Sequence, residues 1–191
     1  MKDVRDILAV FKTMNVPIYL AYGALLGAVR QKDFIPYDDD VDFDVIDPID
    51  FKTRKIIGWK FHDLGFETQD VYFNVFNRME PAEIGYNGDN ETGIIVVQRN
   101  FKFSVFFYKP DGKNYLCVPR VCAVPLLLVP QKFYEKPGKI KLHNEEFMTP
   151  APQKAYLEWV YGADWETPIE EKHAPQWRER VKKEQKNAEF L

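Results

Sequence analysis

Apolar and acidic residues alternate with a period of two between positions 40 and 45. The apolar set is Val41, Phe43 and Val45, and the acidic set is Asp40, Asp42 and Asp44. Because successive side chains of a β-strand point to opposite faces, this alternation predicts a strand with one apolar and one acidic face. The apolar face would hold the strand in the core, and the acidic face would be free for another task.

Helical periodicity appears in three other stretches. Apolar residues fall at helical spacing near the N-terminus, and they predict an amphipathic helix that ends near Asn15. Residues 51–64 and 153–160 predict two more helices, which Gly65 and Gly162 would close as C-terminal caps.

The segment between the first helix and the acidic strand has a different pattern. Pro17 opens an extended run that continues to Tyr22, Gly23 interrupts it, and residues 24–29 predict a short helix. A strand followed by a glycine and a helix N-terminus presents free backbone N–H groups to an anion. The glycine would allow a phosphate to approach the backbone closely.

The second half of the chain predicts further strands. Residues 66–79 and 92–108 have strand character, and Asp111-Gly112 predicts a hairpin turn before residues 115–118. The proline-rich stretch 119–150 predicts mixed loops and short strands. The order of elements predicts an α+β or α/β domain with a mixed sheet, and we favour an α+β fold with that sheet flanked by helices. We expect a single domain over 1–191 whose charged helical tail begins at about 174.

Composition excludes some partners. The net charge of −3 and the pI of about 5.7 give no basic field that would hold DNA or RNA, so we expect no nucleic acid partner. No apolar run is long enough for a transmembrane segment, and the N-terminal residues do not resemble a secretory signal. We therefore expect a cytoplasmic protein that meets any membrane-bound substrate from the aqueous side.

The acidic strand is the strongest chemical signal. Asp40 and Asp42 would share a face with backbones about 7 Å apart, and carboxylates at that spacing can lean together onto a divalent cation. Alone, an acidic run is more often a solvated loop, but a solvated loop has no reason to alternate with Val, Phe and Val. A calcium loop is excluded, because its turn glycine would fall at Val45 and its bidentate glutamate at Phe51.

Two motifs resemble one known family. The first covers residues 22–45, YGALLGAVRQKDFIPYDDDVDFDV, with a Gly-x-Leu-Leu-Gly-x-x-Arg run followed by Phe-Ile-Pro-aromatic-Asp-Asp-Asp-hydrophobic-Asp. The second is Leu157-x-x-x-Tyr161-Gly162-x-Asp164-Trp165. Both resemble, in the same order, the signature and the closing motif of the LicD/fukutin family.

The resemblance implies a nucleotidyltransferase-like fold of the polymerase-beta type and a transferase activity. Members of the family move phosphocholine or a phospho-polyol such as ribitol phosphate from a CDP-linked donor onto a glycan or a lipid-linked sugar. By this resemblance Asp40 and Asp42 would be the catalytic metal ligands for Mg²⁺ or Mn²⁺. Gly23 and Ala24 would lie beside the donor phosphates, and Arg30 would help to neutralise them.

Three departures from the family pattern bear on activity. Ala24 stands where a small hydroxyl residue is common, and the cysteines of the zinc site that some relatives carry are missing. Ser104 stands where a later strand usually carries a third aspartate, and serine is no general base at neutral pH. The candidates to replace this aspartate are Asp44, Asp70 and Asp111.

These departures leave two alternatives beside the phospho-headgroup transferase. One is a catalytically impaired relative that binds a nucleotide or a glycan. The other is a nucleotidyltransferase that uses an NTP and releases pyrophosphate.

Overall fold

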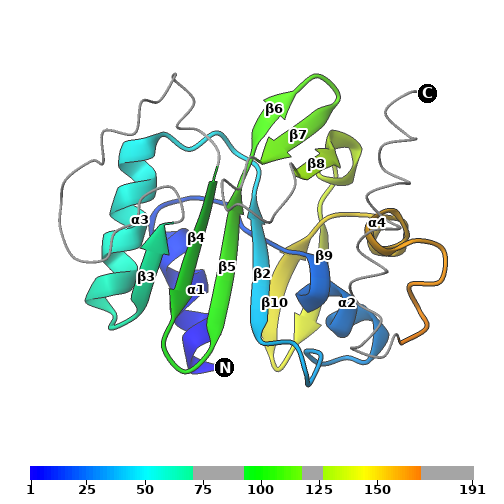
Figure 1. Ribbon diagram of the computed structural model, residues 1–191, viewed down its shortest axis with the longest axis horizontal. Coiled ribbons are helices and arrows are strands. Elements are labelled where there is room, and N and C mark those ends of the chain that lie inside the picture. The colour runs from blue at the N-terminus through cyan, green and yellow to red at the C-terminus, as the bar shows by residue number, and fades with distance from the viewer. Residues whose placement is uncertain (71–92, 118–126, 169–191) are drawn as a thin grey trace.

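The computed structural model describes residues 1–70, 93–117 and 127–168. A mixed sheet of seven strands in the order β3-β4-β5-β2-β1-β10-β9 forms its centre (Figure 1). These strands are β1 (Tyr19–Leu20), β2 (Asp40–Val45), β3 (Glu67–Asp70), β4 (Gly93–Gln98), β5 (Lys102–Phe107), β9 (Gly138–Leu142) and β10 (Glu145–Thr149). A three-stranded sheet contains β6 (Lys109–Asp111), β7 (Asn114–Cys117) and β8 (Leu127–Pro130), and the short 3₁₀ helix η1 (Gln131–Phe133) follows it.

The acidic strand β2 lies in the middle of the large sheet. It pairs in parallel with β5 and antiparallel with β1, and β1 pairs in parallel with β10. Both edges of β2 are therefore covered, which fixes its register and the face on which each side chain lies. The parallel and antiparallel pairs confirm the predicted α+β fold with a mixed sheet.

In the described part of the chain, four α-helices flank this sheet. They are α1 (Lys2–Thr13), α2 (Tyr22–Arg30), α3 (Phe51–Asp63) and α4 (Gln153–Tyr161) (Figure 1). Helices α1 and α3 meet through Phe11 and Phe61, whose ring centroids are 5.9 Å apart. Phe61 also packs against Phe66, and Phe66 packs against Phe103 of β5. Helix α2 instead contacts Phe106 of β5. Residues 103 and 106 point to opposite faces of a strand, so α2 lies on the other side of the sheet from α1 and α3.

The predicted helices and their caps are confirmed. Gly65 and Gly162 follow α3 and α4 with φ angles of 79° and 90°, which a glycine adopts without steric cost. The hairpin turn at Asp111-Gly112 joins β6 to β7 as predicted. Of the predicted strand over 66–79, the structure describes β3, and the predicted tail from about 174 lies outside the described residues. Among the described helices, none has the length and apolar character that a bilayer crossing requires.

The start of α2 differs from the prediction. The helix begins at Tyr22 rather than at residue 24, so Gly23 belongs to the first turn instead of breaking the chain before it. Ala21 is the extended N-cap residue, and its carbonyl accepts the first helical hydrogen bond from the Leu25 N–H. Tyr22 has a φ of 44°, a left-handed conformation that costs energy for a non-glycine residue.

The side chain of Tyr22 explains how this conformation is held. Its hydroxyl lies 2.5 Å from the hydroxyl of Tyr108, and its ring packs against Phe106 and Tyr156. These contacts anchor the residue to β5, to α4 and to the link between β5 and β6. Sequence periodicity carries no information about such distant contacts, so it placed the helix start two residues late.

Candidate metal and phosphate site

The acidic face of β2 has the arrangement that the sequence predicts. Val41, Phe43 and Val45 are almost fully buried, whereas Asp40 and Asp42 are only partly buried. Their neighbour on β5 is Ser104, which is paired with Asp42 in the parallel register. Its hydroxyl donates a 3.0 Å hydrogen bond to Oδ2 of Asp40. The serine therefore lies beside both predicted metal ligands, where the resemblance expects an aspartate.

A compact group of carboxylates lies at the entrance to β2. Asp38, Asp39 and Asp40 each offer one oxygen, and these three oxygens lie within 4.8 Å of one another. The chain turns just before the strand, since the N–H of Asp38 donates to the carbonyl of Ile35. Carboxylate oxygens are the donors that Mg²⁺ and Mn²⁺ prefer, so this set fits the predicted divalent cation.

Asp42 is coupled to this group but does not belong to its closest set. Burial raises the pKa of Asp42 well above its usual range, and the charges of Asp40 and Asp38 raise it further. Burial and the neighbouring charges of Asp40 and Asp39 likewise raise the pKa of Asp38. We call Asp38, Asp39, Asp40 and Asp42 the β2 acidic group. Its members repel one another, and a bound cation would relieve that repulsion.

The first turn of α2 touches the β2 acidic group. A side-chain carbon added at Gly23 would overlap Oδ2 of Asp38, so the absence of a side chain at Gly23 allows the carboxylate to lie against the helix. The N–H groups of Gly23 and Ala24 belong to the first turn and have no partner within the helix. N–H groups without a helical partner and a group of carboxylates thus lie side by side, and a phosphate held by a cation would suit this arrangement.

Lys102 is the cation that the described residues place against this group. Its Nζ lies 2.9 Å from Oδ2 of Asp39 and 3.6 Å from Oδ2 of Asp40. The hydrogen bond from Lys102 lowers the pKa of Asp39. Sequence analysis missed Lys102 and gave no ligand role to Asp38. The signal for Lys102 was its spacing of two residues from Ser104, which puts both on the same face of one strand.

Asp44 continues the acidic face of β2 into the interior. It is fully buried, and its Oδ2 accepts a 2.5 Å hydrogen bond from the hydroxyl of Tyr134. Burial raises the pKa of Asp44 to about 7, although the hydrogen bond to Tyr134 opposes the shift. Within the described part of the chain, its Oδ1 has no hydrogen-bond partner. Asp44 is therefore enclosed by protein, and it does not replace the missing aspartate at the surface of the site.

The remaining predicted residues lie farther from the β2 acidic group. Arg30 is the last residue of α2, seven residues and about 10 Å along the helix from Gly23. The structure thus does not bring Arg30 to the first turn of α2. Asp111 lies on β6 in the small sheet, and Asp70 lies on β3, which β4 and β5 separate from β2. Neither is a neighbour of Ser104 in the sheet.

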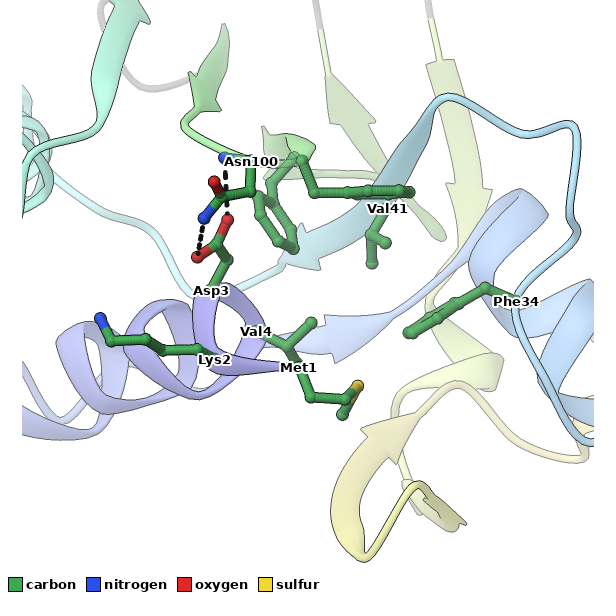
Figure 2. Close-up of a pocket in the computed structure, with 9 residues that line it drawn as sticks. Met1, Lys2, Asp3, Val4, Phe34, Val41 and Asn100 are labelled. Atoms are coloured by element: carbon green, nitrogen blue, oxygen red, sulfur yellow. Dashed lines mark hydrogen bonds between the residues drawn. The ribbon is translucent and has the colours of Figure 1, made fainter.

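A pocket opens on the opposite face of β2. It has a volume of about 350 Å³ and is lined mostly by apolar side chains (Figure 2). Its residues are Met1, Lys2, Asp3, Val4, Phe34, Val41, Asn100, Phe101 and Phe103. Figure 2 shows that two of its polar members, Asp3 and Asn100, are hydrogen-bonded to each other. Because Val41 points away from Asp40 and Asp42, this pocket is separate from the acidic site.

The residues of the site lie within a segment that matches a known protein family. Residues 15–110 match the family described as LicD/FKTN/FKRP, nucleotidyltransferase domain. The chain belongs to this family. The matched residues include α2, the segment just before β2, β2 itself and β5, which together carry Gly23, the β2 acidic group, Lys102 and Ser104. The LicD/FKTN/FKRP signature therefore coincides with the segments that build the site, and membership indicates a transferase.

A solved structure of an adenylyltransferase has a similar fold. The crystal structure of the lincosamide antibiotic adenylyltransferase LnuA with bound lincomycin has a TM-score of 0.51 at 12% identity, over 95% of this chain and 96% of that chain. The crystal structure of ANT(2")-Ia in complex with adenylyl-2"-tobramycin has a TM-score of 0.49 at 16% identity, over 95% of this chain and 91% of that chain. At these identities the LnuA likeness shows the fold alone, and it confirms the predicted nucleotidyltransferase-like architecture.

A curated relative matches over a shorter stretch. The "Uncharacterized protein RP689" of Rickettsia prowazekii (strain Madrid E) is 33% identical over 66 residues. The match covers 35% of this chain and 23% of the relative. The chain thus matches less than a quarter of that protein's length.

Proposed function

We propose that this member of the LicD/FKTN/FKRP family is a metal-dependent transferase that moves a phospho-headgroup from a CDP-linked donor to a sugar hydroxyl. The headgroup would be phosphocholine or a phospho-polyol such as ribitol phosphate, and the acceptor a glycan or a lipid-linked sugar. The observation that supports the proposal is the contact between the β2 acidic group and the first turn of α2, where Asp38 lies against Gly23. It joins carboxylates for a cation to free N–H groups for a phosphate.

Each part of the site has a task in this reaction. Asp40 and Asp42, with Asp38 and Asp39 beside them, would hold Mg²⁺ or Mn²⁺. A divalent cation supplies stabilisation of the negative charge on the transferred phosphoryl group. The N–H groups of Gly23 and Ala24 would hold the donor phosphates in one orientation, because they point outward from the helix start. Positioning of this kind accounts for much of the catalysis of phosphoryl transfer.

Ser104 supports a second candidate, a relative that binds the donor without turning it over. Its hydroxyl donates to Asp40, so it acts as a hydrogen-bond donor where the family usually has a carboxylate. A serine does not take the proton from an attacking hydroxyl at neutral pH. If no other group accepts that proton, the site would bind nucleotide and cation without releasing CMP.

One experiment separates the candidates. The purified protein would be incubated with Mn²⁺ and CDP-choline, CDP-ribitol, ATP or CTP, with a mixture of sugar acceptors, and CMP and pyrophosphate release would be measured beside calorimetric binding. CMP release from a CDP-donor that the double substitution Asp40→Asn with Asp42→Asn abolishes would support the transferase. Tight CDP-donor binding without CMP would favour the impaired relative, and pyrophosphate release would favour the nucleotidyltransferase.

A further inference from the structure

Lys102 contacts two of the three carboxylates in the compact group of Asp38, Asp39 and Asp40. Its ammonium contacts Oδ2 of Asp39 at 2.9 Å and lies 3.6 Å from Oδ2 of Asp40. The same Oδ2 of Asp40 accepts the hydrogen bond of Ser104 at 3.0 Å. Two of the three carboxylates in the compact group are therefore already engaged by groups from β5.

A divalent cation and the lysine ammonium exclude each other at these oxygens. A carboxylate oxygen that coordinates a cation points its lone pairs at the cation, and the ammonium would then approach a like charge. At the partly exposed position of Lys102, whose side chain is 31% exposed, such repulsion is screened but not abolished. A cation bound at these carboxylates would therefore repel the ammonium from Asp39 and Asp40.

The geometry gives the displaced ammonium a second partner. The first turn of α2 borders the compact group at Asp38, and Lys102 borders it at Asp39 and Asp40. A phosphate bound to a cation in this group would have backbone N–H groups on one side and Lys102 on the other. Lysine suits this exchange, because its charge is a compact ammonium at the end of a flexible four-carbon stem.

We propose that Lys102 competes with the divalent cation for Asp39 and Asp40 and, once displaced, binds the phosphates of the nucleotide donor. The inference rests on the proposed function, and it assigns a donor-binding residue that lies outside the family's signature run. In the absence of cation the lysine balances part of the charge of the β2 acidic group. With the cation present, the positive charge moves from the carboxylates to the donor.

The test measures cation binding without any reaction. Free Mn²⁺ would be followed by electron paramagnetic resonance during titration of the wild type and of Lys102→Met, Lys102→Arg and Lys139→Met. Lys139 is the matched control, because it also forms a lysine–carboxylate pair, with Glu146 at 2.7 Å, but lies on β9 away from the site. We expect Lys102→Met to bind Mn²⁺ about tenfold more tightly, since it removes a competing charge. Lys102→Arg and Lys139→Met should keep the wild-type affinity.

A second titration measures the donor side. At saturating Mn²⁺, CDP should bind Lys102→Met about tenfold more weakly than the wild type, because one charged hydrogen bond to phosphate is lost. Lys139→Met should again match the wild type. The two expected effects of Lys102→Met have opposite signs, which loss of folding could not produce.

The outcomes separate this inference from the proposed function. Unchanged or weaker Mn²⁺ binding by Lys102→Met would overturn the competition, and unchanged CDP affinity would overturn the transfer of the lysine to the donor. If both titrations give the expected changes while no CDP-donor is turned over, the lysine exchange stands and the proposed transferase does not. If the wild type and every variant fail to bind Mn²⁺, both are overturned.

Discussion

The protein has two groups of aspartates, and their surroundings differ in the balance of charge. In the first, which we call the Arg99 network, Asp3 and Asp6 of α1 both bind Arg99, and Asn100 donates two further hydrogen bonds to Asp3. In the second, the β2 acidic group, Lys102 pairs with Asp39 and Asp40, which are two of its four carboxylates. The first group resembles a structural ion-pair network. The second has an excess of negative charge, which a bound cation would stabilise.

The pKa of Asp3 in the Arg99 network and the pKa values of Asp38 and Asp42 in the β2 acidic group move in opposite directions. Burial alone would raise the pKa of Asp3, but hydrogen bonds from Arg99 and Asn100 outweigh it and lower the pKa. Burial and neighbouring carboxylates instead raise the pKa values of Asp38 and Asp42. Acidic clusters are thus distinguished by whether the fold supplies their partners. A cluster whose partners are missing is the better candidate for a ligand site.

The largest effect is expected from a substitution in the β2 acidic group. Asp42→Asn should lower kcat/KM for the CDP-donor about a thousandfold, because it removes a carboxylate that would hold the cation. That cation would stabilise the negative charge of the transition state. The free energy of unfolding should not fall, since the substitution removes a repulsive charge. Steady-state CMP release and urea unfolding of the same preparation would test both. Asp47→Asn, an exposed aspartate just beyond β2, is the control and should leave both unchanged.

The second-largest effect is expected from a substitution in the Arg99 network. Asp3→Asn should lower the free energy of unfolding by about 2 kcal/mol, because it removes a buried charge-assisted hydrogen-bond acceptor. CMP release should be unchanged at a temperature where the variant is folded. Lys2→Met removes the exposed pair between Lys2 and Asp6 and should change stability by less than about 0.5 kcal/mol. A large loss of activity in folded Asp3→Asn would contradict a purely structural role.

The third prediction concerns how the stability of the protein depends on pH. Asp44 has a folded-state pKa of about 7, raised by burial, so the folded protein takes up a proton that the unfolded chain does not. Stability should therefore rise as the pH falls from above 7 towards about 4. Asp3 and Asp6 have lowered folded-state pKa values, so their contribution is present above about pH 4 and lost as the pH falls further.

Urea unfolding between pH 2.5 and 8, with a chelator present, would reveal both limbs. Asp44→Asn should flatten the limb near neutral pH, whereas Asp3→Asn should flatten the acidic limb. If either substitution changed the limb assigned to the other residue, the contrast between the two regions would be wrong.

The smallest expected effect concerns the contact between α2 and the β2 acidic group. A methyl group in Gly23→Ala would displace the flexible carboxylate of Asp38 rather than the backbone, so stability should change little. Donor binding should weaken about fivefold, because the methyl group crowds the phosphate side of the first turn. Calorimetry with CDP and Mn²⁺ would measure it, and Gly58→Ala in α3, where a methyl group meets only ordinary contact, is the control.

Local pattern predicted much of the fold because each signal lay within one element. The alternation of Val41, Phe43 and Val45 with aspartates gave β2 its bounds, and Gly65 and Gly162 marked the ends of two helices. The family signature, in turn, placed Ser104 where an aspartate is expected, and the structure puts it beside Asp40. These predictions needed only residues close in sequence or a known motif.

The rest of the site depends on contacts that periodicity does not encode. The turn at Ile35 brings Asp38 and Asp39 up to Asp40, although the two-residue rule for strands links only Asp40 and Asp42. Lys102 reaches the same carboxylates because β5 pairs in parallel with β2. The ligand roles of Asp40 and Asp42 and the phosphate roles of Gly23, Ala24 and Arg30 stay predictions.

The parallel pairing of β2 with β5 has a consequence for biosynthesis. More than fifty residues separate the two strands. On the other side of β2, β1 pairs with β10, which ends only at Thr149. A ribosome that has released only the signature run has therefore made the aspartates without the lysine and serine that border them. The β2 acidic group therefore acquires its final surroundings only when these distant segments join, so its assembly reports completion of the central sheet.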